Sequence, residues 1–208
     1  METLRERKKQ RTRDALLRAA LELFTTRGYE RTTVDEIAQA VDVSQRTFFR
    51  YFAGKEEAAL AVADMTVARF VEAVRERPPH EAPLEALRQA VLDGWNSVHE
   101  IVEQVVPVEL YLRMCRVIES TPVLLAAYLR HSVETEETIA RILADREGLD
   151  VEADPRPRLA VAAFGGVMRL TERHWSSGEN VTLEEMRALA SRYLDQLGPA
   201  LMGSWRTA

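Results

Sequence analysis

The chain has 208 residues, of which 46% are hydrophobic and 29% charged, a composition that excludes a disordered chain and allows one or two domains with a sizeable core. Its single cysteine, Cys115, excludes an internal disulfide and a cysteine-based zinc cluster, and no apolar run approaches the ~18 residues of a membrane span. Because the N-terminus is charged and lacks the apolar core of a signal peptide, we expect a cytoplasmic protein.

The formal net charge of −5 is unevenly distributed along the chain. Residues 1–55 hold 12 Lys and Arg against 8 Asp and Glu, whereas residues 56–208 hold 16 against 25. This pattern predicts that any contact with nucleic acid is confined to the N-terminal part. Residues 1–13 are basic and mostly polar, and two interpretations are open: a solvated tail, or an arm that follows DNA phosphates or the minor groove.

The next residues predict two helices. Apolar residues at helical spacing indicate a helix over residues 14–27, which Gly28 ends. Thr33 is followed three residues later by Glu36, the spacing of a capping box, and this pair predicts the start of a second, short helix.

A third short helix is expected over about residues 45–52, after a turn at residues 41–43 and a capping residue, Ser44. At about 100° per residue, Phe48 and Phe52 point toward a core on one side of this helix. A small three-helix core with a solvated basic face would explain both phenylalanines. It does not explain the polar residues at the start of the helix, which in a helix-turn-helix face base edges in the major groove.

The run VSQRTFFRYFAGKEE, residues 43–57, closely resembles the signature of TetR-type transcriptional regulators, and AALELFTTRGYERTTVDEIAQA, residues 19–40, resembles the preceding helices of that family. The resemblance implies phosphate contacts at Thr33, Thr47, Tyr51 and Lys55 and base contacts around Gln45 and Arg46. The predicted DNA-binding residues are Thr33, Ser44, Gln45, Arg46, Thr47, Phe49, Arg50, Tyr51 and Lys55.

Two positions depart from the family pattern. Asp42 stands at the turn where the family usually has Gly, and Asp tolerates the left-handed conformation better than most residues. Phe49 stands where the family often has Tyr, so a phosphate-directed hydroxyl is missing, although the ring could touch a thymine methyl or a sugar. The variant RTFFRYF is similar to a subgroup of actinobacterial regulators associated with acyl-CoA thioesters.

The rest of the chain predicts further helices and no strand. They cover residues 56–77 and 83–104, a shorter segment that Pro107 opens and that contains Ile118, residues 123–146 and 159–175, and a last helix through Leu197 that Gly198 and Pro199 stop. The adjacent Gly165 and Gly166 indicate close approach of another helix or a ligand. We therefore predict an all-α protein of about nine helices, with a DNA-binding domain over residues 1–55 and a second domain over residues 56–208.

The second domain carries no catalytic or nucleotide-binding signature, and its histidines lie on separate segments without metal-ligand spacing. We therefore predict no catalytic residue, cofactor or metal. The family resemblance implies an effector pocket between the middle helices and a dimer interface on the last two. The pocket candidates are Trp95, Tyr111, Met114, Tyr128, Phe164 and Met168, all of which could instead fill the core. The dimerisation candidates are Phe164, Gly165, Leu189 and Tyr193.

The expected protein is a repressor that binds a palindromic DNA operator as a homodimer and is released by a small apolar or amphipathic effector. Two alternatives remain open at this point. One is a DNA-binding activator or architectural protein that senses no ligand, and the other is an α-helical enzyme that carries the motif by chance.

Overall fold

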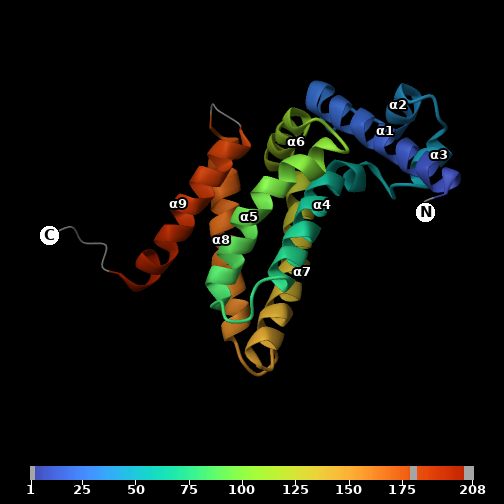
Figure 1. Cartoon of the computed structure of the whole chain (residues 1–208). Coiled ribbons are helices and arrows are strands. Elements are labelled where there is room, and N and C mark those ends of the chain that lie inside the picture. Colours follow the sequence, from blue (N-terminus) through green and yellow to red (C-terminus); the bar gives the residue numbers. More distant parts are fainter. Residues whose placement is uncertain (1–2, 179–181, 204–208) are drawn as a thin grey trace. The chain divides into compact units, whose positions relative to one another are not determined.

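A computed structural model describes residues 3–178 and 182–203, and among these residues the regular elements are nine α-helices, which confirms the predicted fold class (Figure 1). The helices are α1 (Leu4–Arg27), α2 (Val34–Ala40), α3 (Gln45–Phe49), α4 (Lys55–Arg75), α5 (Pro83–Glu103), α6 (Val108–Ser120), α7 (Pro122–Glu147), α8 (Arg156–Ser176) and α9 (Leu183–Met202).

The chain divides into two compact units. Unit 1 contains the residues up to Thr66 together with His99–Tyr128, and unit 2 contains Val67–Val98 and the residues from Leu129 onward. The divisions fall inside α4, α5 and α7, so unit 1 is larger than the predicted domain of residues 1–55. The additional part belongs to unit 1 because α6 packs against α1.

Unit 1 is built on one face of α1. Its fully buried side chains include Leu17, Leu21 and Phe24, and Phe48 and Phe52 complete the same core. The guanidinium of Arg18 donates to the carbonyl oxygen of Val105 at 3.3 Å and so ties α1 to the segment that precedes α6.

Helix α1 begins ten residues earlier than the sequence pattern predicted. Thr3 and Glu6 form a capping box, in which the Thr3 hydroxyl accepts from the Glu6 amide and the Glu6 carboxylate accepts from the Thr3 amide. These bonds satisfy amides that a helix start leaves without partners. The interpretation of this segment as an irregular tail is therefore wrong for Leu4–Arg13, which are helical.

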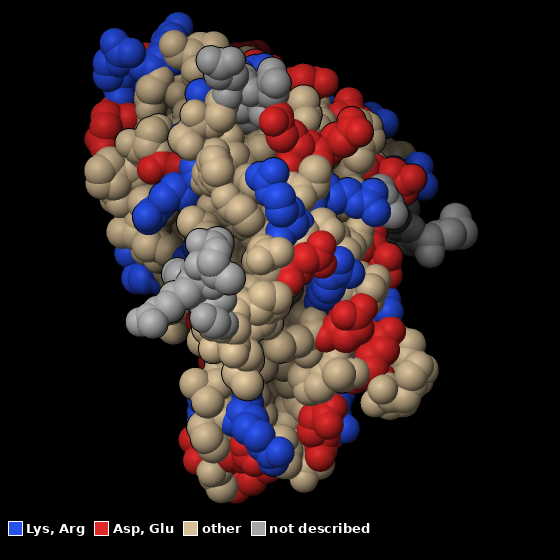
Figure 2. All heavy atoms as spheres, turned by 90° about the vertical axis from the view of Figure 1, so that its left-hand side faces the viewer, with Lys and Arg blue, Asp and Glu red and all other residues tan. Residues whose placement is uncertain are grey.

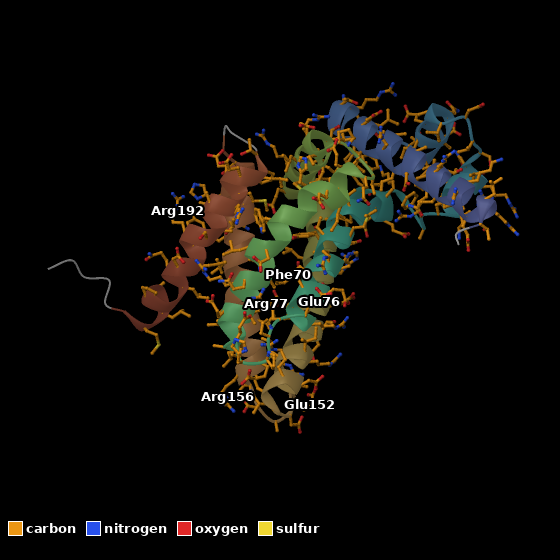
Figure 3. The ribbon with its side chains drawn as sticks, in the orientation of Figure 1. Phe70, Glu76, Arg77, Glu152, Arg156 and Arg192 are labelled. Atoms are coloured by element: carbon orange, nitrogen blue, oxygen red, sulfur yellow. The ribbon has the colours of Figure 1, made fainter. Side chains whose placement is uncertain are left out.

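Unit 2 has its own hydrophobic core. Phe164 of α8 stacks on Phe70 of α4 with a centroid distance of 5.7 Å and an interplanar angle of 9°, and Leu143 and Leu194 contribute from α7 and α9. Figure 3 labels Phe70 on α4. Helix α9 packs along α8, and Arg88 of α5 forms an ion pair with Asp195 of α9 at 2.7 Å.

In unit 2, arginine side chains form hydrogen bonds to the connection between α4 and α5 and to the connection between α7 and α8. Arg146 donates to the carbonyl oxygens of Arg77 and Pro78 at 2.8 and 2.9 Å, between α4 and α5. Arg158 donates to the Glu137 carboxylate at 2.9 and 3.0 Å and to Glu152, which lies with Arg156 near the connection from α7 to α8 (Figure 3). Because several donors of each guanidinium are used, these connections are held in one geometry.

The structure tests two predictions made for α8 and α9, the close approach at Gly165 and Gly166 and the helix stop at Pro199. At the glycine pair, an added Cβ on Gly165 would lie 2.5 Å from the end of the Glu136 side chain of α7, which pairs with Arg169, whereas Gly166 has no neighbour within 4 Å of such an atom among the described residues. The predicted stop at Pro199 is wrong, because α9 continues to Met202. Proline removes only one hydrogen bond, and in an exposed last turn water can replace it for the freed carbonyl.

Candidate nucleic-acid interface

The interface is built on two short helices with fixed starts. At α2 the Thr33 hydroxyl accepts from the Glu36 amide at 3.2 Å, and the Glu36 carboxylate accepts from the Thr33 amide at 2.9 Å, which confirms the predicted capping box. At α3 the Ser44 hydroxyl accepts from the Thr47 amide at 3.3 Å. Caps of this kind stabilise a helix by about 1 kcal/mol each, which matters for helices of seven and five residues.

The turn between α2 and α3 has the expected left-handed residue. Asp42 has φ of 54°, and the amides of Asp42 and Val43 donate to the carbonyl oxygens of Gln39 and Ala38 at 3.1 and 3.0 Å. Asp tolerates this conformation because its short polar side chain can bond locally. The left-handed turn therefore forms here without a glycine.

Helix α3 has one buried and one exposed side. Phe48 is fully buried and its ring lies 5.5 Å from that of Phe52, which is also buried. Phe49 is 53% exposed and meets Phe48 edge to face at 5.6 Å. Gln45 and Arg46 are exposed at the start of the helix, as predicted for residues that read bases.

Other predicted contact residues already have partners within unit 1. The Thr33 hydroxyl lies 2.9 Å from the Glu36 carboxylate, so its proton is directed there. The Tyr51 hydroxyl accepts from Arg50, whose guanidinium also lies 5.0 Å from the Tyr51 ring centroid. Arg50 and Tyr51 are therefore held as a pair at the end of α3.

Lys55 is the most strongly engaged of the predicted residues. Its ammonium donates to the carbonyl oxygens of Tyr29 at 2.9 Å and Thr32 at 3.1 Å, and it lies 4.3 Å from the centroid of the Tyr29 ring. Burial of Tyr29, helped by the nearby carboxylates of Glu56 and Glu30, raises the pKa of its hydroxyl to about 12. Lys55 thus fixes the turn between α1 and α2, a role that the sequence did not indicate.

We expect Lys55→Ala to lower the free energy of unfolding by about 1–3 kcal/mol, because two partly buried carbonyl oxygens lose their donor. Urea denaturation measures this change. Arg31→Ala is the matched control, since Arg31 donates to one exposed carbonyl in the same turn and its loss should cost under about 0.5 kcal/mol. Equal stability of the two variants would contradict a structural role for Lys55.

One face of the molecule carries charges of both signs. On the face that Figure 2 shows, basic and acidic side chains are interspersed among uncharged ones. A surface of mixed sign gives a polyanion little net attraction.

The six pocket candidates are divided between the two units. In unit 1, Tyr111 and the buried Met114 lie on α6, and Tyr128 lies on α7 at the end of the unit. In unit 2, Phe164 and Met168 lie one turn apart on α8 and pack in the same core, and Trp95 of α5 is half-buried. The structure therefore brings Phe164 and Met168 together in one core, and it places the other four candidates on α5, α6 and α7.

Two of the dimerisation candidates are buried within unit 2. Phe164 is 4% exposed and Leu189 is 7% exposed, while the Tyr193 hydroxyl bonds to the His174 ring. An apolar stripe lies elsewhere on α8, with Leu159, Ala162 and Leu170 exposed and Gly166 half-buried between them. Their spacing of three and four residues was a signal that sequence analysis missed.

Within residues 3–178 and 182–203, no three His, Cys, Asp or Glu side chains are grouped so that they could hold a metal ion. In the same residues, no helix combines the length and the apolar composition that crossing a membrane requires.

Comparisons with known proteins give consistent results along the chain. Residues 16–62 match the family model described as bacterial regulatory proteins, tetR family, and residues 81–201 match the model of the MftR C-terminal domain. The chain is 45% identical to the transcriptional regulator TcmR of Streptomyces glaucescens, over 98% of this chain and 90% of that protein. It is 30% identical to the transcriptional regulator MftR of Mycobacterium tuberculosis, over 80% of each chain.

A solved structure shows the same fold. The TetR-family repressor FadR of Thermus thermophilus, in complex with lauroyl-CoA, aligns over 94% of this chain and 98% of its own, with a TM-score of 0.51 and 22% identity.

Proposed function

The chain belongs to the TetR family of bacterial regulatory proteins and is a helix-turn-helix transcriptional regulator, and we propose that it is a homodimeric repressor released from its operator by a small molecule. The observation that supports the DNA-binding part most directly is the geometry of α3. Its buried face fixes the helix on the core of unit 1, and its exposed start presents Gln45 and Arg46. Arg can bridge the two acceptors of guanine, and Gln can pair with adenine.

The remaining predicted contacts have supporting roles in this proposal. Ser44, Thr47, Phe49, Arg50 and Tyr51 lie on or next to α3 near Gln45 and Arg46 in the chain, and Thr33 and Lys55 stand at the starts of α2 and α4. Contacts from such residues to phosphates would set the register of the helix in the groove. In a homodimer, two copies of α3 would meet half-sites about 34–36 Å apart on a palindromic operator.

The proposed interface between copies uses α8 and α9. The apolar stripe Leu159, Ala162, Gly166 and Leu170 on α8 and the exposed Leu201 and Met202 on α9 are surfaces that a second copy could bury. Small residues such as Ala162 and Gly166 allow two helices to approach closely. Sedimentation velocity of the purified chain tests this assignment, and a monomer at micromolar concentration would contradict it.

The proposed effector is apolar or amphipathic. Apolar side chains predominate among the six pocket candidates. The repressor FadR of Thermus thermophilus, which has the same fold, is in complex with lauroyl-CoA, an amphipathic molecule. The effector would favour a dimer geometry in which the two α3 helices no longer match the half-site spacing, which is a shift between two populated states.

The test is a mobility-shift assay on the DNA upstream of the chain's own gene, with and without a metabolite extract of the source organism. We expect a protein–DNA complex of reduced mobility, and we expect the extract to dissociate it. Retention of the complex with every extract fraction would contradict ligand release, and binding no better than to random DNA would contradict operator recognition at this promoter.

A further inference from the structure

The first three turns of α1 form a basic segment outside the part of the chain that matches the family model. Leu4–Arg13 precede residue 16, where that match begins. The segment carries Lys or Arg at positions 5, 7, 8, 9, 11 and 13, with Glu6 as the acidic residue among them. Because Thr3 and Glu6 cap the helix, these charges are held on a regular scaffold.

The charges fall on two sides of the helix. Arg5, Lys9 and Arg13 follow one another at single-turn spacing, and the same side of α1 carries the core residues Leu16 and Ala20 further along. The side of α1 that packs on the core thus becomes basic where the helix extends beyond the core. Arg13 on this side lies over Phe52, whereas Arg5 and Lys9 are exposed, and an exposed helix face that carries positive charge fits an anionic partner.

The acidic groups of the segment have other partners. The Glu6 carboxylate accepts from the amide and the hydroxyl of Thr3 at 2.7 and 2.9 Å, and these bonds lower the pKa of Glu6. Asp14 accepts from the Gln10 side chain at 2.8 Å. Arg5 and Lys9 are exposed.

The segment lies beside the helix that reads DNA. The Arg13 guanidinium lies 5.2 Å from the ring centroid of Phe52, just after α3, and Figure 1 shows the start of α1 next to α3 within unit 1. At about 1.5 Å per residue, Leu4 lies about 14 Å further along the helix axis than Arg13. The basic extension thus begins next to Phe52 and continues along the helix axis for about 14 Å to Leu4.

We propose that the basic side of this extension, Arg5, Lys9 and Arg13, binds the phosphate backbone of duplex DNA beside the groove that α3 enters. This inference rests on the proposed function, since it needs a DNA-binding chain. The proposed contact adds affinity that does not depend on the DNA sequence. The arm that the sequence offered as one interpretation is a helix over Leu4–Arg13. Arg13 fixes the segment, and Arg5 and Lys9 bind the outlying phosphates.

The experiment compares two double variants of equal charge. Arg5→Gln with Lys9→Gln neutralises the inner side, and Lys8→Gln with Arg11→Gln neutralises the outer side of the same turns. Glutamine preserves helix propensity. Equilibrium affinity is measured between 50 and 300 mM salt on a duplex enriched by the parent chain from randomised DNA, and on a random duplex of equal length.

We expect the inner pair to make the slope of log affinity against log salt shallower by about 0.9 for each phosphate that is no longer neutralised, on both duplexes. The outer pair should leave the slope within error of the parent chain. Equal changes for both pairs would indicate long-range charge alone and overturn the proposal, as would no change for either.

A second measurement separates this inference from the proposed function. Trimming the enriched duplex at its outer ends should remove the difference in affinity between the parent chain and the Arg5→Gln, Lys9→Gln double variant. A difference that persists on the trimmed duplex would overturn the proposed phosphate binding. Failure of the parent chain to enrich any duplex would instead overturn the proposed function.

Discussion

Replacing Phe48 with alanine is expected to lower the free energy of unfolding by about 3–5 kcal/mol and to abolish operator binding. The Phe48 side chain is fully buried and packs on Phe52 at 5.5 Å, so its removal leaves a cavity beneath α3. A five-residue helix cannot hold its conformation alone, because helix nucleation is unfavourable and most helical stability comes from packing. Urea denaturation followed by circular dichroism measures the loss.

The neighbouring Phe49 provides the matched control. It is 53% exposed, so Phe49→Ala should change the free energy of unfolding by under about 1 kcal/mol, and the chain should stay folded. Both variants delete the same atoms from adjacent positions. Equal destabilisation would show that the burial of Phe48 does not fix α3.

Arg46→Ala is expected to remove base discrimination of about 1–3 kcal/mol in each half-site, which is about 5- to 150-fold. Arg46 is exposed at the start of α3, where a guanidinium can bridge the acceptors of guanine. The measurement is a competition assay in which the bound operator is challenged with duplexes that differ at single base pairs. Discrimination should fall at one base pair per half-site and persist at the others.

Arg50→Ala removes the same charge from the end of the same helical segment and serves as the control. Its guanidinium is held on Tyr51, so we expect affinity to fall by a similar factor for every duplex. If Arg46→Ala also weakened all duplexes equally, Arg46 would bind phosphate and the reading residue would lie elsewhere.

Local signals in the sequence predicted the helix-turn-helix well. Thr33 and Ser44 cap the helices that they were expected to cap, and Asp42 takes the left-handed conformation. Each of these outcomes depends on a few adjacent residues. The start of α1 was missed because its first turns have no apolar periodicity, although the capping-box spacing of Thr3 and Glu6 was a usable signal.

Tertiary roles could not be read from sequence in the same way. An apolar residue at helical spacing can fill a core, line a pocket or face a second copy, and Phe164 was expected in the latter two roles but packs on Phe70. Lys55 donates to the carbonyl oxygens of Tyr29 and Thr32, which lie 26 and 23 residues earlier in the chain. No local sequence pattern predicts hydrogen bonds over such separations.

Helix α1 has a mechanical consequence through its length. It is 24 residues long without a break, bonded through Arg18 to the carbonyl before α6 and carrying its basic extension at the other end. At about 1.5 Å per residue, Leu4 is about 21 Å from Arg18 along the axis, so a tilt of about 5° at Arg18 displaces Leu4 by about 2 Å. That displacement exceeds the tolerance of a hydrogen bond to phosphate. A small rotation near α6 would therefore be amplified by the long first helix and would move its start away from the phosphates that we propose it binds.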